Sequence, residues 1–264
     1  MCRNRRGCQI RRAERLRIRI KDSDDLKVEE GVFDVPTLKA LYRLSNKKFI
    51  RSLGGVMSTG KEANVFHALD EKGEIAVKIY RITTSDFRAM QEYITGDPRF
   101  KSIKHDKKDI VIAWTKKELR NLMRAHDAGV RVPMPIISER NVLVMEFIGK
   151  DGIHAPLLKE VASEIEDPVG TYEKITEYMR LLYHKAGLVH ADLSEYNIMY
   201  YGEPIFIDMG QSVLLSHPHA EEFFVRDVGN IVRFFRKLGV ECSEEGLIAE
   251  IKRGGKDDPH QSAG

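Results

Sequence analysis

Two pairs of alternating apolar runs constrain the fold of this chain more than any other feature. Residues 63–69 (ANVFHAL) and 74–80 (EIAVKIY) alternate in polarity and are rich in Val, Ile and Phe, with turn residues between them. Residues 135–139 (PIISE) and 141–149 (NVLVMEFIG) repeat the pattern around a second turn. Runs of this kind predict β-hairpins. Together with a short apolar stretch that begins at Ile50, they predict a five-stranded antiparallel sheet.

Helical spacing of apolar residues dominates the rest of the chain. A short helix is predicted over 36–44, and a longer one over 115–129 with a glycine at its end. After the second hairpin, further helices are predicted over 171–187 and near 220–238. The predicted fold class is therefore α+β, with a five-stranded first lobe and a mainly helical second lobe.

The composition is that of an ordinary soluble protein. The chain has 264 residues, of which 42% are hydrophobic and 31% charged. This length is enough for one large domain or for two lobes with separate cores. No apolar run approaches the roughly 20 residues that a membrane span needs, so no membrane role is expected. Cys2, Cys8 and Cys242 form no C-x-x-C pair, which disfavours a disulfide scaffold or a zinc ribbon and predicts a cytoplasmic location.

Positive charge is concentrated at the N-terminus. Residues 1–21 hold nine Arg or Lys and one Glu, whereas the whole chain carries a net charge of +3, so the remainder is net acidic. Two interpretations stay open: a solvated tail, or an arm that binds RNA phosphates and loses affinity steeply with salt. A transit peptide is disfavoured because the segment is poor in Ser.

The glycine-containing turn before the first hairpin resembles a phosphate-binding loop. Residues 55–61 match the first seven positions of the Walker A pattern, but Glu62 stands where Ser or Thr should bind magnesium. A Walker A loop also opens a helix, whereas the residues after Lys61 predict a strand. The pattern therefore disfavours a P-loop GTPase. It is either a plain turn between strands or a flexible turn that covers phosphates.

Lys78 lies in the middle of an apolar strand, where its charge must find an anion or its head must reach solvent. It is either an edge-strand lysine or the phosphate-binding lysine of the kinase pattern V-A-I-K. Glu118 also has two interpretations. It completes a capping box with Thr115, or it pairs with Lys78 as the helix-C glutamate of kinases does. The ion pair is favoured because Glu118 flanks the apolar face of its helix.

The motif HADLSEYN at residues 190–197 matches the kinase catalytic loop H-x-D-L-x-x-x-N. Asp192 can accept the proton of an attacking hydroxyl, and Asn197 can offer an oxygen to a metal ion. Asp208, in FIDMG at the end of an apolar run, matches the D-F-G aspartate and supplies the hard oxygen that magnesium prefers. Either aspartate alone could be a cap or a turn residue. The ordered set predicts kinase-type chemistry.

One further aspartate and three histidines are predicted to have supporting or structural roles rather than catalytic ones. Asp227, among apolar neighbours in the last predicted helix, is expected to accept N–H bonds from the HADL loop; the alternative is an exposed charge. His190 is expected to be a packed residue, since Asp192 already fills the role of base. His217 and His219 lack the spacing of a zinc site and are interpreted as loop residues.

The chain closely resembles the RIO family of atypical serine/threonine protein kinases, in particular its type-one subgroup. The resemblance rests on STGKEANVF, AVKIY, LVHADLSEYNI and FIDMGQ, in this order, and covers about residues 32–253. It implies a two-lobed kinase-like fold that binds ATP and Mg²⁺, with Mn²⁺ as an alternative. It also implies a role in the maturation of the small ribosomal subunit, on particles of protein and rRNA. The lack of long extensions resembles archaeal members.

The resemblance implies a role for each matching residue. Asp192 would be the base, Asn197 and Asp208 would hold the metal ion, and Asp208 would also be a candidate acceptor of phosphate. Lys78 would bind the phosphates directly. Five residues of the glycine-containing turn would line the triphosphate: Ser58, Thr59, Gly60, Lys61 and Glu62. Met145 would be the gatekeeper. The backbone of two residues would meet the adenine edge: Glu146 and Ile148.

The same resemblance divides the chain. The N-lobe is expected at 32–145, with an insertion at about 81–112 that is either functional or mobile, and the hinge at 146–149. The reduced C-lobe is expected at 150–253. Flexible segments are expected at both ends: a basic arm at 1–31 and a tail at 254–264.

Three departures from ordinary protein kinases affect the expected activity. Ala191 replaces the arginine that clamps a phosphorylated activation loop, and Ser194 replaces a lysine near the transferred phosphoryl group. No A-P-E motif follows Asp208. Efficient phosphorylation of extended peptides is therefore not expected. ATP hydrolysis or self-phosphorylation is expected instead, and Ser102 and residues 83–85 are the candidate sites of self-phosphorylation. The alternative is a nucleotide-gated module that binds pre-ribosomal particles. The sequence gives no indication of the oligomeric state.

Overall fold

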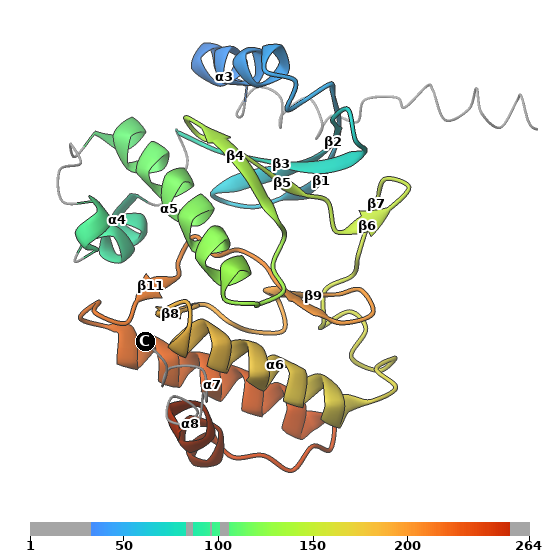
Figure 1. Ribbon diagram of the computed structural model, residues 1–264, viewed down its shortest axis with the longest axis vertical. Coiled ribbons are helices and arrows are strands. Elements are labelled where there is room, and N and C mark those ends of the chain that lie inside the picture. Colours follow the sequence, from blue (N-terminus) through green and yellow to red (C-terminus); the bar gives the residue numbers. More distant parts are fainter. Residues whose placement is uncertain (1–32, 83–86, 96, 101–105, 254–264) are drawn as a thin grey trace, which may run out of the picture.

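The computed structural model describes residues 33–82, 87–95, 97–100 and 106–253. Its first lobe is built on an antiparallel five-stranded sheet with the order β1-β2-β3-β5-β4 (Figure 1). The strands are β1 (Ser52–Thr59), β2 (Ala63–Leu69), β3 (Glu74–Tyr80), β4 (Pro135–Glu139) and β5 (Val142–Glu146). Both predicted hairpins are present, and the pairing of β3 with β5 joins them into one sheet.

The two faces of the sheet have different neighbours because side chains alternate along each strand. Val77 and Ile79 of β3 belong to the cluster formed with α3 (Val35–Asn46), which covers one face. Lys78, between them, points to the opposite face. That face lies toward α5 (Lys107–Asp127), the helix between the sheet and the second lobe in Figure 1. The alternation of one strand thus directs a charged side chain to the space between the lobes.

Helix α5 begins at Lys107 rather than at the predicted Thr115. The capping-box interpretation of Thr115 is wrong, because its hydroxyl donates to the carbonyl oxygen of Val111 at 2.9 Å, a bond typical of a threonine inside a helix. The charged residues at the start of the helix concealed its first two turns. Ile110 and Val111 are nevertheless buried and anchor those turns.

The described part of the predicted insertion contains secondary structure that its polar sequence concealed. It holds α4 (Phe87–Ile94) and the 3₁₀ helix η1 (Pro98–Phe100). Met90 and Ile94 of α4 are buried in one cluster with Trp114 of α5. Tyr93 of the same helix packs its ring against Trp114. A helix of eight residues is stabilised mainly by such docking and is too short for a periodicity to stand out in the sequence.

The second lobe is mainly helical, as predicted. Helices α6 (Pro168–His184) and α7 (Ala220–Lys237) pack against each other through the ring pairs Tyr172–Phe235 and Tyr183–Phe224, and α8 (Glu244–Arg253) packs beneath them (Figure 1). Helix α8 was not predicted; Leu247 and Ile251, one turn apart, bury it against the core. Six short strands complete the lobe: β6 (Gly149–Lys150), β7 (Ile153–His154), β8 (Leu188–Val189), β9 (Ile198–Tyr200), β10 (Pro204–Phe206) and β11 (Val213–Leu214).

Some predictions fall on residues outside the described ranges. These are the basic arm at 1–31, the tail at 254–264, and the self-phosphorylation candidates Ser102 and residues 83–85. The numbered boundaries of the lobes and the hinge stay predictions. Within the described ranges, no helix combines the length and the apolar character needed to cross a membrane.

Candidate active site between the lobes

A cavity of about 710 Å³ lies between the sheet and the second lobe. Most of the residues predicted to form the site line it: Ser58, Gly60, Lys61, Glu62, Lys78, Glu118, Met145, Glu146, Ile148, Asn197 and Asp208. Thr59 and Asp227 are not among the lining residues, and neither is Asp192, although Asp192 is hydrogen-bonded to Asn197. Segments that are far apart in the sequence therefore meet around one space.

The glycine-containing turn at residues 58–62 lines one side of this cavity. Gly60 N–H donates to the carbonyl oxygen of Ala63 at 2.9 Å, which closes a tight turn between β1 and β2. A Cβ atom at position 60 would lie 3.0 Å from that same oxygen, so glycine permits the close approach. A strand follows the turn, not a helix. The turn therefore has no helix N-terminus, which a Walker A loop requires.

Lys78 connects both lobes through two carboxylates. Its Nζ donates to Glu118 Oε1 at 2.7 Å and to Asp208 Oδ1 at 2.9 Å. Tyr80 donates a hydrogen bond to the second oxygen of Glu118. The predicted contact between Lys78 and Glu118 is thus present in the structure. Through its two bonds Lys78 joins β3 to α5 and to Asp208, which lies two residues after β10.

The charges of this cluster stabilise one another. Burial opposes the charge of Lys78, but the carboxylates of Asp208 and Glu118 outweigh it and hold the Lys78 pKa well above its ordinary value. Burial likewise opposes the charge of Asp208, and the Lys78 ammonium outweighs it, so that the pKa of Asp208 is lowered. Burial raises the pKa of Glu118, against the attraction of Lys78. The Asp208 side chain is still 49% exposed, so it can meet a ligand.

The catalytic-loop motif folds so that Asp192 and Asn197 lie side by side. Asn197 Nδ2 donates to the backbone oxygen of Asp192 at 2.7 Å and to its Oδ2 at 2.9 Å. Both amide hydrogens are thereby directed at Asp192, and the amide oxygen remains as the group that can face a cation. Burial raises the pKa of Asp192, and the bond from Asn197 opposes this shift.

Asp227 of α7 braces the catalytic loop as predicted. Its carboxylate accepts N–H bonds from Ala191 at 2.8 Å and from Leu193 at 2.9 Å. Ala191 has a φ of 66°, in the left-handed region that a residue with a Cβ atom rarely adopts. The two bonds to Asp227 hold the backbone on both sides of Asp192 in this strained shape. Asp227 acts here through the backbone and is not itself part of the cavity.

The three histidines considered in the sequence, His190, His217 and His219, do not line the cavity. His190 is 1% exposed and donates from Nε2 to the carbonyl oxygen of Ile207 at 3.0 Å, while burial lowers its pKa to about 4. It is therefore neutral at pH 7 and ties the catalytic loop to the residue before Asp208. His217 lies in a turn, as predicted, but is buried against the backbone of Glu92 and Thr95 at the end of α4. His219 is the residue before α7.

Three polar residues that contact this site were missed. Arg131 forms a bidentate ion pair with Glu146 at 2.7 and 2.8 Å, which fixes the segment that joins the lobes. Lys117 and Asn121, on α5, are completely buried and bond to the loop that follows Asp208. Their positions one residue before and three after Glu118, on a helix with a buried face, were the available signal. Sequence alone gave no reason to place that face against the loop.

The residues around the cavity fit a magnesium ion that arrives with its nucleotide. Among the described residues, no three His, Cys, Asp or Glu side chains lie close enough together to hold a metal ion. Asn197 and Asp208 line the same cavity and offer two hard oxygen donors. Magnesium in phosphate-binding sites takes one or two protein ligands and completes its shell with phosphate oxygens and water. These two side chains are therefore a sufficient protein contribution.

Comparison with known protein families decides the identity. Residues 64–247 match the RIO domain. This chain belongs to the RIO family. The matched segment contains the catalytic loop, Asp208 and Asp227, and the family predicted from the four motifs is confirmed. The chain is accordingly an enzyme of the protein-kinase type.

Individual relatives of this RIO chain lie in different domains of life. The RIO-type serine/threonine-protein kinase Rio1 of Haloferax volcanii is 52% identical over 236 residues, which cover 89% of this chain and 80% of the relative. Rio1 of Methanocaldococcus jannaschii is 43% identical, over 91% and 82% of the two chains. Human RIO1 is 42% identical over 84% of this chain but only 40% of its own length. The RIO domain is thus the part they share.

A solved structure supports the fold. The Rio2 kinase of Chaetomium thermophilum, crystallised as an ADP/Mg²⁺-phosphoaspartate complex, superposes with a TM-score of 0.62 at 27% identity. The match covers 83% of this chain and 66% of the Rio2 chain. The predicted two-lobed kinase-like α+β fold is therefore confirmed.

Proposed function

We propose that this RIO kinase transfers the γ-phosphoryl group of ATP, with a divalent metal ion, to a Ser/Thr hydroxyl, to water or to one of its own residues. The observation that carries the proposal is the convergence of Lys78, Asn197 and Asp208 on one interlobe cavity, with Asp192 hydrogen-bonded to Asn197 at its edge. Such a set can hold the triphosphate, accept a proton and hold a metal ion at neighbouring points.

The hinge backbone suits adenine. Glu146 N–H donates to Met134 O at 2.8 Å, and Ile148 O accepts from Ala155 N–H at 2.9 Å. Both residues line the cavity, and in the proposed complex the carbonyl of Glu146 and the N–H of Ile148 would face the adenine edge. One acceptor and one donor complement the amino group and the ring nitrogen of adenine. Met145 would pack beside the base as the gatekeeper.

The proposed transfer follows from the placement of the side chains. The hydroxyl oxygen of the acceptor attacks the γ-phosphorus, the bond to the β–γ bridging oxygen breaks, and ADP leaves. Asp192 accepts the proton of that hydroxyl, and the ammonium of Lys78 and the turn at 58–62 bind the phosphates. Magnesium, or manganese in its place, supplies positive charge against the phosphate oxygens and would be held by Asn197 and Asp208.

Asp208 has a second candidate role as the acceptor itself. In that case its carboxylate oxygen attacks the γ-phosphorus, ADP leaves, and water later hydrolyses the acyl phosphate. The phosphoaspartate in the Rio2 complex supports this possibility for the related kinase. The lowered pKa of Asp208 keeps the carboxylate ionised and nucleophilic.

We further propose that the activity serves the maturation of the small ribosomal subunit in the cytoplasm, through ATP hydrolysis or self-phosphorylation. Only residues 209–219 connect Asp208 to α7, so the described chain contains no peptide-docking segment at this place. This short connection also favours the second candidate function, a module whose nucleotide state sets its affinity for a pre-ribosomal particle of protein and rRNA. Both candidate functions include contact between the basic arm and RNA.

Radiolabelled ATP with magnesium tests the proposal. Wild-type protein should hydrolyse ATP or become labelled, and Asp192→Asn should lose about 10²-fold to 10⁴-fold in rate while still binding ADP. Sensitivity of the label to hydroxylamine distinguishes an acyl phosphate on Asp208 from a Ser/Thr phosphoester. Failure of the wild type to turn over ATP or to label itself would refute the enzymatic proposal. If Asp192→Asn were released from the pre-ribosomal particle as the wild type is, the second candidate function, the nucleotide-gated binding module, would be supported instead.

A further inference from the structure

One face of α5 holds the loop that follows Asp208. Trp114, Lys117 and Asn121 are spaced by three and four residues, so they project from the same side of the helix. Lys117 Nζ donates to Gly210 O at 2.7 Å and to Ser212 O at 2.5 Å. Both lysine and helix are buried at this point, so the contact is shielded from water.

Asn121 adds two hydrogen bonds between α5 and the loop that follows Asp208. Its Nδ2 donates to Met209 O at 2.9 Å and to Ser212 O at 2.8 Å. The backbone oxygens of residues 209, 210 and 212 are therefore all turned toward α5. The carboxylate of Asp208, just before them, accepts from Lys78 and lines the cavity. The direction of Asp208 is thus linked to the hydrogen bonds that its successors make.

The loop needs such support because its backbone is strained and tightly packed. Asp208 has a φ of 61°, in the left-handed region. A Cβ atom on Gly210 would lie 2.8 Å from Trp114 Nε1, so the loop lies directly against the helix. Ala191 stands where ordinary kinases carry the arginine that clamps this region from the other side. Helix α5 supplies the described polar contacts instead.

The same contacts reach the segment after α4. Arg99 Nη1 donates to Asn121 Oδ1 at 3.0 Å, which orients the amide so that its Nδ2 faces the loop. Asp97, which is 4% exposed, holds the Arg99 guanidinium with bonds of 2.6 to 3.1 Å. A continuous chain of polar bonds therefore runs from Asp97 through Arg99 and Asn121 to the residue after Asp208.

We propose that Lys117 and Asn121 are positioning residues that keep the Asp208 carboxylate directed at the metal and nucleotide, and that Arg99 couples this alignment to the segment 97–100. The inference deepens the proposed function and rests on it. Neither side chain lines the cavity, so each acts through the backbone of residues 209–212. The contacts of α5 thus hold the loop in place through hydrogen bonds to its backbone.

The test compares ADP binding with and without magnesium in three variants. Lys117→Met removes the Nζ donors and keeps an unbranched apolar stem. Asn121→Asp removes the amide donors and keeps an oxygen for Arg99. Arg99→Lys keeps the charge beside Asp97 but gives up the second arm that reaches Asn121. The matched control is Lys116→Met, the same change at an exposed neighbour.

Calorimetry should show that magnesium strengthens ADP binding in the wild type and in Lys116→Met. In Lys117→Met and Asn121→Asp this gain should shrink about tenfold, with metal-free ADP binding changed by no more than about twofold. Arg99→Lys should give a smaller reduction of the gain. Amide hydrogen exchange of residues 208–213 should accelerate in the variants while α7 stays protected.

Two results would overturn the inference. One is an unchanged magnesium-dependent gain in folded variants with unchanged exchange at 208–213. The other is an equal loss of ADP affinity with and without magnesium, together with faster exchange throughout the protein, which would make Lys117 and Asn121 core-packing residues only. If the wild type bound no ADP at all, the proposed function would fail as well, so the two failures are distinguishable.

Discussion

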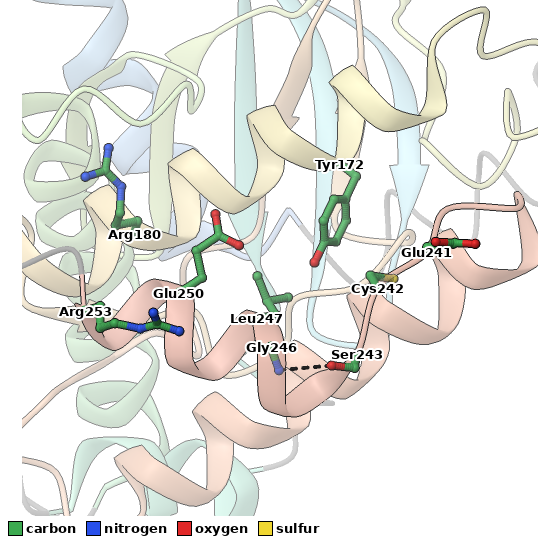
Figure 2. Close-up of a pocket in the computed structure, with 9 residues that line it drawn as sticks. All are labelled: Tyr172, Arg180, Glu241, Cys242, Ser243, Gly246, Leu247, Glu250 and Arg253. Atoms are coloured by element: carbon green, nitrogen blue, oxygen red, sulfur yellow. Dashed lines mark hydrogen bonds between the residues drawn. The ribbon is translucent and has the colours of Figure 1, made fainter.

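The interlobe cavity measures about 710 Å³, and a second one of about 820 Å³ lies between α6 and α8 (Figure 2). Tyr172 and Leu247 lie between the two helices of the second cavity, and Arg180, Glu250 and Arg253 gather at one end of it (Figure 2). Those three charged side chains are exposed.

The difference lies in the burial of charge. Lys78 and Glu118, in the interlobe cavity, are buried and paired, with pKa values shifted by burial and by each other. The charged groups of the second cavity are hydrated at the surface, where they carry little consequence for stability or chemistry. Buried charge is expensive to keep unless geometry compensates it, so its presence marks a site better than volume does.

The largest expected effect comes from removing the shared cation. Lys78→Met leaves the buried Glu118 carboxylate without its positive partner, and the free energy of unfolding should fall by about 3 kcal/mol. ATP turnover should vanish as well. Urea unfolding measures the first effect, and labelled ATP measures the second.

A second substitution separates those two effects. In the double variant Lys78→Met/Glu118→Gln, the neutral amide still accepts from Tyr80, so most of the lost stability should return while turnover stays absent. If the double variant were no more stable than Lys78→Met alone, the buried charge of Glu118 would not be the cause of the destabilisation.

A smaller, pH-dependent effect is expected at His190. Burial lowers its folded pKa to about 4 from an ordinary value of 6.5, so between these values the unfolded chain binds more protons than the folded one. The stability of the wild type should therefore fall as pH falls through this window, by at most about 1.4 kcal/mol per pH unit from this group.

His190→Gln has no such titration and is the natural comparison. Its stability relative to the wild type should improve from pH 7 to pH 5 in urea unfolding. Burial raises the pKa of Asp227 to about 7, which acts in the opposite direction, but Asp227 is present in both proteins and its effect cancels in the difference. Parallel pH profiles would show that His190 does not stay neutral in the folded protein.

The smallest effect is expected in the second cavity. Arg180→Met should change the free energy of unfolding by no more than about 0.5 kcal/mol, because the side chain is exposed. ADP binding and ATP turnover should stay at the wild-type level. A marked loss of either would mean that the cavity between α6 and α8 communicates with the nucleotide site, and the contrast between the two cavities would fail.

The sequence predicted most of the local structure around the site. Both hairpins, the Lys78–Glu118 pair and the bracing by Asp227 were expected from alternation, helical spacing and motif order. The start of α5 was missed because its first turns are charged, and α8 was missed because it is short and few apolar residues, chiefly Leu247 and Ile251, anchor it. Such elements are stabilised by their docking and leave little periodicity of their own.

The sequence by itself determined which chemical groups are present and in what order: a phosphate-covering turn, a strand lysine, Asp192, Asn197 and Asp208. Only the tertiary structure decided which helix face meets which loop. Lys117 and Asn121 look in the sequence like ordinary surface residues, and they are buried because α5 is laid against residues 209–212. Long-range contacts of this kind depend on how separate elements pack, and no local pattern encodes them.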